Sequence, residues 1–130
     1  YERVQCPRHL KFVRSQPCSI HKNNVHCNGM GFGIDAHHLM LQGGHAMGFK
    51  ESDHWTLSLC RFHHNEVSAC GNEKDFWSRW DMSYEEAEGI AMSMSLNSHS
   101  LAIVERMIIN LKFSGYTEDE ITGMRIPIWL

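Results

Sequence analysis

The chain has 130 residues, a formal net charge of −3 at neutral pH and a mean hydropathy of −0.37. This length favours a single domain over residues 1–130, and the hydrophobic content of 42% is typical of a water-soluble globular protein. No apolar run approaches the roughly 18 residues that a membrane-spanning helix needs, so we expect no membrane partner. The net charge by itself argues against a general nucleic-acid-binding protein.

Charge is distributed unevenly between the two halves of the chain. Residues 1–64 contain seven Lys and Arg against four Asp and Glu, whereas residues 65–130 contain five against eleven. A surface that contacts phosphate groups is therefore expected in the first half.

The first expected element is a short helix over residues 7–16, because proline is favoured in the first turn of a helix and Pro17 would end it. Leu10 and Val13 would face inward. The outward face would carry Arg8, Lys11 and Arg14, for which a solvated charged face is a simpler interpretation than a DNA contact.

The middle of the chain predicts two strands and a helix. A loop rich in Asn and Gly over residues 18–33 leads to a strand over residues 33–40. A glycine-containing loop over residues 41–53 leads to a second strand over residues 54–59, in which polar and apolar residues alternate. A helix follows over residues 61–69, with Gly71 where glycine commonly ends a helix.

The last third of the chain predicts amphipathic helices. Two capping boxes, at residues 83–86 and 117–120, each open a helix, the first reaching about Leu96. Between them, a helix over residues 100–113 would bury the stripe Leu101, Val104, Ile108 and Leu111. We therefore expect an α+β fold, with a small metal-stabilised core over about residues 10–80 and additional C-terminal helices over about residues 81–130 packed on it.

Histidine is concentrated between residues 35 and 64, which hold six of the ten histidines. Within this stretch, Cys60 and His63 form a Cys-x2-His step where the second strand ends and the helix begins. Zinc takes four nitrogen or sulfur ligands, and we expect the step to supply two of them to a structural zinc ion. Cys18 would supply a third. For the fourth, Cys27, which precedes Asn-Gly as in a metal-binding knuckle, is favoured over His21.

The cysteine count also bears on the cellular compartment. Five is an odd number, and three of the cysteines stand at metal-like spacings. Thiolate ligands in a reducing cytoplasm are therefore favoured over disulfide bonds, and Cys6 and Cys70 are expected to take no part in the zinc site.

A second group of histidines predicts a catalytic site. His37 and His38 follow one another at the end of the first strand, so their side chains should point to opposite faces. His64 lies about 100° around the helix from His63 and can face away from the zinc. A strand histidine, a helix histidine and a carboxylate, most simply Asp53, can hold a divalent metal against a phosphate, and another imidazole can take a proton from water.

This order of residues resembles the HNH, or ββα-metal, nucleases in their zinc-stabilised (treble-clef) branch. The spacing is most similar to that of the small prophage-encoded YbcO-like HNH nucleases and of the nuclease domain of the phage Ref protein. The resemblance covers roughly residues 10–80. It rests on Cys18, Cys27-Asn28-Gly29, Ala36-His37-His38, Ser52-Asp53 and Leu59-Cys60-Arg61-Phe62-His63-His64.

The resemblance implies a metal-dependent endonuclease that hydrolyses DNA phosphodiester bonds, serving phage or prophage recombination or DNA processing. His38 would be the general base, and Asp53 matches the family's loop acid. His37 and His64 would hold a catalytic divalent metal (Mg²⁺, Mn²⁺ or Zn²⁺). The structural zinc would be held by Cys18, Cys27, Cys60 and His63. Candidates for contacts with the flanking DNA phosphates are Arg14, Lys50 and Arg61.

A second hypothesis comes from another class of protein. The chain could be a catalytically inactive zinc module that binds DNA or a recombination protein. Ser68 stands where relatives often carry His or Asp, and the Asn that often orients the base is not evident. Metal content separates the two hypotheses, because a nuclease would bind a second, exchangeable metal beside the tightly held zinc.

Overall fold

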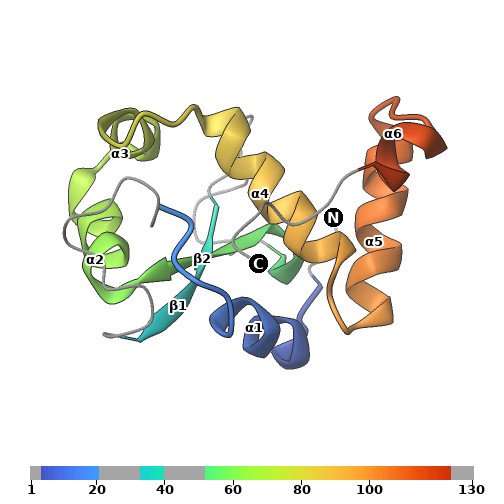
Figure 1. The fold of residues 1–130 in the computed structure, drawn as a ribbon, viewed down its shortest axis with the longest axis horizontal. Helices are drawn as coiled ribbons and strands as arrows, with labels where there is room; N and C mark the ends of the chain where they lie inside the picture. Colours follow the sequence, from blue (N-terminus) through green and yellow to red (C-terminus); the bar gives the residue numbers. More distant parts are fainter. Residues whose placement is uncertain (1–3, 21–32, 40–51, 124–130) are drawn as a thin grey trace.

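The computed structural model describes residues 4–20, 33–39 and 52–123 (Figure 1). Its α+β architecture, mostly helical with a small two-stranded sheet, agrees with the predicted fold class. The elements in chain order are α1 (Pro7–Arg14), β1 (Ile34–His38), the 3-10 helix η2 (Asp53–Trp55), β2 (Thr56–Cys60), α2 (Arg61–Cys70), α3 (Glu73–Arg79), α4 (Tyr84–Leu96), α5 (Leu101–Phe113) and α6 (Glu118–Thr122).

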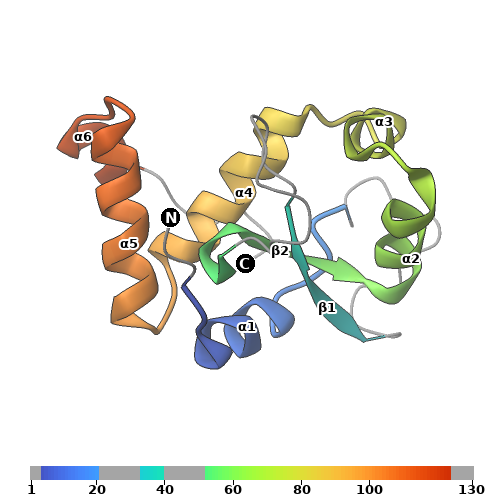
Figure 2. The same cartoon turned by 180° about the vertical axis from the view of Figure 1, so that it is seen from behind.

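The sheet lies between two groups of helices. α2 and α3 lie at one end of the molecule and α5 and α6 at the opposite end (Figures 1 and 2). β1 and β2 pair in antiparallel fashion, with Ile34 opposite Cys60 and His38 opposite Thr56. This register puts the Cys60 end of β2 beside the start of α2, and it puts His38 beside η2.

β2 is the most enclosed element, since all five of its residues are buried. Successive strand residues point to opposite faces, so both faces of β2 must be covered. α1, α2 and α4 all pack against it. α4 therefore belongs to the same core as the sheet, and its residues Ala87, Ala91 and Met94 are fully buried there.

α5 and α6 form a smaller cluster of their own, centred on Met107, Leu111 and Ile121. The buried stripe predicted for α5 was partly wrong. Leu101 is 69% exposed, and the buried row is Ile103, Met107 and Leu111. The helix is hydrophobic around much of its circumference, so apolar spacing alone did not fix which stripe faces the core.

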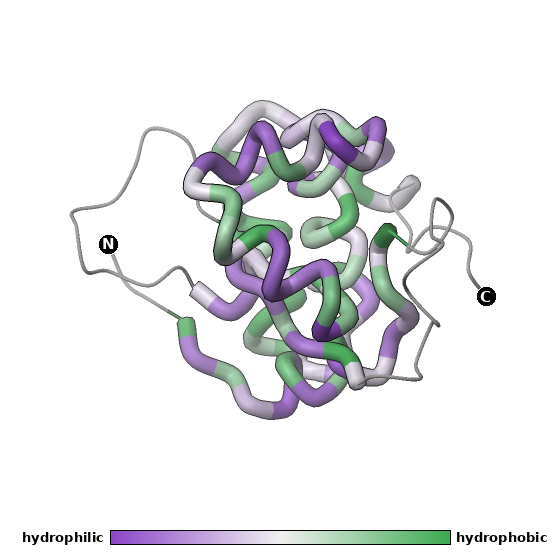
Figure 3. The backbone as a smooth tube through the Cα atoms, turned by 90° about the vertical axis from the view of Figure 1, so that its left-hand side faces the viewer, coloured by the Kyte–Doolittle hydropathy of each residue, from purple (hydrophilic) through white to green (hydrophobic). Residues whose placement is uncertain are grey.

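Local capping explains where the C-terminal helices begin. The two predicted capping boxes are present, Ser83 with Glu86 at α4 and Thr117 with Glu120 at α6. The sequence interpretation missed α3, which opens where the Asn72 side chain accepts a hydrogen bond from the Lys74 backbone N–H. Along the helices, hydrophobic and hydrophilic residues follow one another as expected for elements with one buried side (Figure 3).

Two buried histidines tie the C-terminal helices to the rest of the chain. His9 Nδ1 in α1 lies 2.8 Å from Ser98 Oγ, and His54 Nε2 in η2 lies 2.8 Å from Asn110 Nδ2 in α5. Burial lowers the pKa of each ring from the ordinary 6.5 to about 4. Both imidazoles are therefore neutral in the folded protein at neutral pH. In the part of the chain that the structure describes, no helix is long and apolar enough to cross a membrane.

The buried histidines predict a loss of stability in acid. Below pH 6.5 the unfolded chain takes up protons on these rings while the folded protein does not, so the free energy of unfolding falls between pH 6.5 and about 4. Each ring accounts for about 3 kcal/mol, at 1.36 kcal/mol per pH unit. His54→Gln should flatten the profile measured by urea unfolding. His99→Gln, at an exposed position, is the control. If the free energy of unfolding changes with pH by the same slope in the parent, His54→Gln and His99→Gln, the prediction is contradicted.

Candidate functional site

Three of the predicted zinc ligands meet inside the protein. Cys18 follows α1, Cys60 ends β2, and His63 lies in the first turn of α2; all three are buried. His63 Nδ1 lies 3.2 Å from Cys60 Sγ and 3.5 Å from Cys18 Sγ. The three donor atoms lie within 4.8 Å of one another, so this group, here called the Cys/His cluster, could hold a metal ion.

The fourth ligand lies outside the described residues, whether it is Cys27, as predicted, or His21. Cys6 and Cys70 are half-buried free cysteines that take no part in the Cys/His cluster, as expected. The Cys6 thiol donates to Ser100 Oγ at 3.1 Å.

An aromatic wall encloses the cluster on one side. The Trp80 ring meets the His63 ring edge-on, with centroids 4.6 Å apart. The Trp80 indole N–H donates to Glu66 Oε1 at 2.6 Å, which fixes the orientation of the ring. His63 is fully buried, and an interior of low polarity strengthens the attraction between thiolates and a cation.

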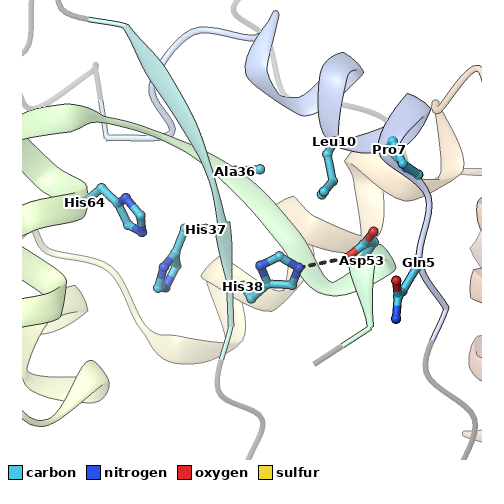
Figure 4. Close-up of a pocket in the computed structure, with 8 residues that line it drawn as sticks. All are labelled: Gln5, Pro7, Leu10, Ala36, His37, His38, Asp53 and His64. Atoms are coloured by element: carbon cyan, nitrogen blue, oxygen red, sulfur yellow. Dashed lines mark hydrogen bonds and ion pairs between the residues drawn. The ribbon is translucent and has the colours of Figure 1, made fainter. Parts of the chain in front are cut away.

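A pocket of about 560 Å³ lies between β1, the start of α1 and η2 (Figure 4). It is lined by Gln5, Pro7, Leu10, Ala36, His37, His38, Asp53 and His64. The four residues predicted to form the catalytic site, namely His37, His38, Asp53 and His64, are thus brought together.

Each histidine of the pocket stands beside a carboxylate from another part of the chain. His38 Nε2 lies 2.9 Å from Asp53 Oδ1, and His64 Nδ1 lies 3.0 Å from Asp35 Oδ2. His37 Nε2 lies 3.4 Å from Glu73 Oε1. We call these the three histidine–carboxylate pairs. A carboxylate accepts a hydrogen bond from an N–H group at one ring nitrogen. The other ring nitrogen of a neutral imidazole then carries the lone pair.

The pairs divide between the two faces of β1, as strand alternation predicts. His37 and His64 lie on one side of the strand, with ring centroids 5.4 Å apart, whereas His38 turns toward Asp53 on the other (Figure 4). Asp35 shares the His37 face, two residues earlier. One face of β1 therefore carries two neighbouring imidazoles, and the other carries the single imidazole that is bonded to Asp53.

Asp53 was expected to be the carboxylate of the catalytic site, and it lies in the pocket with the three histidines, bonded to His38. Its carboxylate is only 4% exposed, and Oδ2 accepts the Cys6 backbone N–H at 2.6 Å. Held on both sides, the Asp53 carboxylate restricts the orientation of the His38 ring.

Asp35 was missed as a site residue, and it changes the interpretation of Arg61. The Arg61 guanidinium donates to both Asp35 oxygens, at 2.9 and 3.1 Å. Burial of the Asp35 carboxylate opposes its ionisation, but the hydrogen bonds from Arg61 and His64 outweigh it and hold the pKa below its usual range. Arg61, predicted to contact DNA phosphate, is thus engaged within the protein and holds Asp35 in place.

The other predicted residues are less central. Arg14 is exposed on α1, and Lys50 lies outside the described residues. The Ser68 hydroxyl donates to the His64 carbonyl of its own helix at 3.0 Å. Ser68 therefore supplies no donor to the pocket in place of the His or Asp of the resembled family.

Comparison with known proteins identifies the family of this chain. A family model described as "Protein of unknown function (DUF968)" matches residues 1–103. The chain belongs to the DUF968 family. It is also 40% identical over 60 residues to the Uncharacterized protein YdfU of Escherichia coli (strain K12), a match that spans 46% of this chain and 15% of that relative. No solved structure matches the chain.

The matched residues 1–103 include the Cys/His cluster and all three histidine–carboxylate pairs. The site described here thus lies entirely in the part of the chain that defines its membership of the DUF968 family.

The Cys/His cluster predicts that the fold depends on a bound metal. Cys60→Ser and Cys18→Ser should lose the metal and unfold, because a structural metal contributes roughly 10 kcal/mol in small domains, about the whole stability of such a chain. Metal content per chain and thermal unfolding measure this. Cys70→Ser is the matched control and should keep both.

A cooperatively folded Cys60→Ser protein without metal would contradict this dependence. His21→Ala and Cys27→Ala, compared by metal content, identify the fourth ligand.

Proposed function

We propose that this protein is a metal-dependent endonuclease of the HNH type that hydrolyses DNA phosphodiester bonds. The observation that carries the proposal is the pocket in which an Asp-bonded histidine lies next to two further histidines, each with its own carboxylate. This is an arrangement for proton removal beside a cation, which phosphodiester hydrolysis requires.

His38 serves as the general base. Asp53 Oδ1 accepts a hydrogen bond from Nε2, so the lone pair of the neutral ring lies on Nδ1. The His38 side chain is 30% exposed and lines the pocket, so a water molecule can reach it. When Nδ1 takes a proton from that water, the water oxygen attacks the phosphorus in line and the bond to the 3′ oxygen breaks. The 3′ oxygen leaves with the bonding electrons and takes a proton from a second water molecule, which gives the 3′-hydroxyl. A 5′-phosphate results, as in the resembled family.

His37 and His64 would hold the catalytic metal. Both rings line the pocket on one face of β1, and a histidine that binds a metal commonly donates its other ring N–H to a carboxylate. Asp35 and Glu73 stand in that position. A divalent ion bound there supplies positive charge that polarises the phosphate and stabilises the leaving oxygen.

Two imidazoles leave room for water and substrate oxygen on such an ion. Among the described residues, the Cys/His cluster is the one group with three donor atoms within 4.8 Å, so the pocket does not form a closed metal cage. A catalytic ion needs positions left for water and substrate. Of the expected ions Mg²⁺, Mn²⁺ and Zn²⁺, two imidazole ligands would suit Mg²⁺ least, because Mg²⁺ prefers oxygen ligands.

The Cys/His cluster supports a structural role for zinc. Two thiolates and an imidazole, all buried, match the closed Cys-rich shells that zinc prefers. With β1, β2 and α2 following one another around it, the cluster favours the treble-clef form of the ββα-metal fold. The free cysteines favour a reducing, cytoplasmic setting.

DNA would approach along α1. Pro7 and Leu10 line the pocket, and the same helix carries Arg8, Lys11 and Arg14, all exposed. Phosphates on either side of the scissile bond could therefore contact α1 while the bond itself lies against His38.

The general base is tested by His38→Ala, which should abolish cleavage of a supercoiled plasmid while leaving zinc content and fold intact. A base contributes about 10²- to 10⁴-fold, which a nicking assay resolves. His64→Ala should lose activity too, but higher Mn²⁺ should partly restore it, because a lost ligand weakens metal binding. His99→Ala, outside the pocket, is the control.

Parental nicking by His38→Ala, or its rescue by Mn²⁺ to the same degree as His64→Ala, would assign His38 a different role and point to His37 as the base. A parent that binds one zinc per chain and no second metal, and that does not nick DNA, would instead support the inactive zinc module.

The DNA path is tested by Arg8→Gln, Lys11→Gln and Arg14→Gln together. Phosphate contacts do not depend on sequence, so affinity should fall for all DNA sequences, and each lost contact should reduce the slope of log affinity against log salt by about 0.9. A variant with Gln at Lys74, Arg79 and Lys112, exposed residues that do not line the pocket, changes the charge equally. Equal slopes in the two variants would show that α1 faces away from DNA.

A further inference from the structure

The third histidine–carboxylate pair, His37 with Glu73, includes a residue from outside β1, β2 and α2. Glu73 opens α3, yet its Oε1 lies 3.4 Å from His37 Nε2 on β1. The two side chains are 14% and 11% exposed, so the contact lies largely out of water. We propose that Glu73 is a positioning residue that fixes the tautomer of His37, with the proton on Nε2 and the lone pair of Nδ1 left for a divalent cation. The cation part of this inference rests on the proposed function.

Burial of the His37 nitrogen supports this assignment. His37 Nε2 has almost no contact with solvent and makes no hydrogen bond of good geometry to the described residues. A buried N–H without an acceptor costs about 1–3 kcal/mol. Glu73 Oε1, at 3.4 Å, is the acceptor at hand.

The other oxygen of Glu73 is also committed. The Trp77 indole N–H donates to Glu73 Oε2 at 3.1 Å, one helical turn further along α3. Trp77 is fully buried, so its ring cannot turn away. An indole N–H is a donor only and requires an acceptor. The carboxylate can satisfy both neighbours because both of its oxygens accept.

This arrangement makes Glu73→Gln a specific test. The glutamine amide has one acceptor oxygen, and the Trp77 indole N–H donates to it. The amide NH₂ group must then face His37. Nε2 must then accept, the proton moves to Nδ1, and the lone pair offered to a cation is lost. The substitution changes neither the size of the side chain nor its contacts with the core.

The experiment uses the full chain, loaded with zinc, in alkaline buffer. The nitrogen-15 shifts of the His37 ring, assigned by comparison with His37→Gln, report which nitrogen carries the proton. Mn²⁺ affinity is measured by electron paramagnetic resonance of the free ion. Glu73→Gln should move the proton from Nε2 to Nδ1 and weaken Mn²⁺ binding by about 10- to 100-fold, the range typical of lost carboxylate partners of metal ligands.

Two further variants separate positioning from a general structural role. Glu66→Gln makes the same change at a carboxylate that accepts from the Trp80 indole, and it should alter neither the tautomer nor the Mn²⁺ affinity. In Glu73→Gln with Trp77→Phe the indole donor is gone, so the amide oxygen can turn to His37 and restore both quantities. If this double variant does not fold, Glu73→Ala replaces it and should lose less affinity than Glu73→Gln.

The outcomes are distinct from those that test the nuclease. A parent protein with the His37 proton on Nδ1, or a Glu73→Gln protein with parental tautomer and Mn²⁺ affinity, overturns the role of Glu73 even if His38→Ala abolishes cleavage. A proton shift and a loss of Mn²⁺ affinity in Glu73→Gln support that role even if the parent cleaves no DNA, in which case the proposed function fails alone.

Discussion

The direct step from β2 into α2 is the constraint on which the rest of the structure depends. Cys60 ends the strand and caps the helix, with no linker between them. The first turn of α2 must therefore follow the strand direction, which brings His63 to the Cys/His cluster and His64, one position later, to the pocket. A metal that holds Cys60 and His63 would fix this step, and with it the distance between the two sites.

The pocket illustrates how much a cluster of histidines depends on its surroundings. An imidazole can carry its proton on either nitrogen, and three free rings would populate many combinations of tautomers and rotamers. Asp35, Asp53 and Glu73 each bias one ring, from β1, η2 and α3 respectively. These carboxylates come from separate elements, so the chemical state of the pocket depends on correct packing of β1, η2, α2 and α3 against one another.

Much of the fold followed from local sequence patterns, and the errors arose where contacts between distant residues decide. The capping boxes and the Cys60–His63 spacing are local, and each was confirmed. The second strand, predicted over residues 54–59 from alternating polar and apolar residues, begins only at Thr56 and is buried throughout. Glu73 lies 36 positions after His37, and nothing in its surroundings predicts that it meets a strand. The contact between Asp53 and His38 could not be predicted for the same reason, since nearness in sequence does not show which histidine a carboxylate meets.

The N-terminal segment and the C-terminal helices both contact η2, which carries the carboxylate partner of His38. Asp53 accepts the Cys6 N–H, and its neighbour Ser52 accepts the Val4 N–H at 2.8 Å, so residues before α1 hold the start of η2. On the other side of η2, His54 is held by Asn110, and its carbonyl accepts the Ser95 hydroxyl at 2.6 Å. η2 is thus fixed from both directions. The proposed general base would have to keep its orientation to within a fraction of an ångström, and through these two attachments helices remote from the pocket contribute to its geometry.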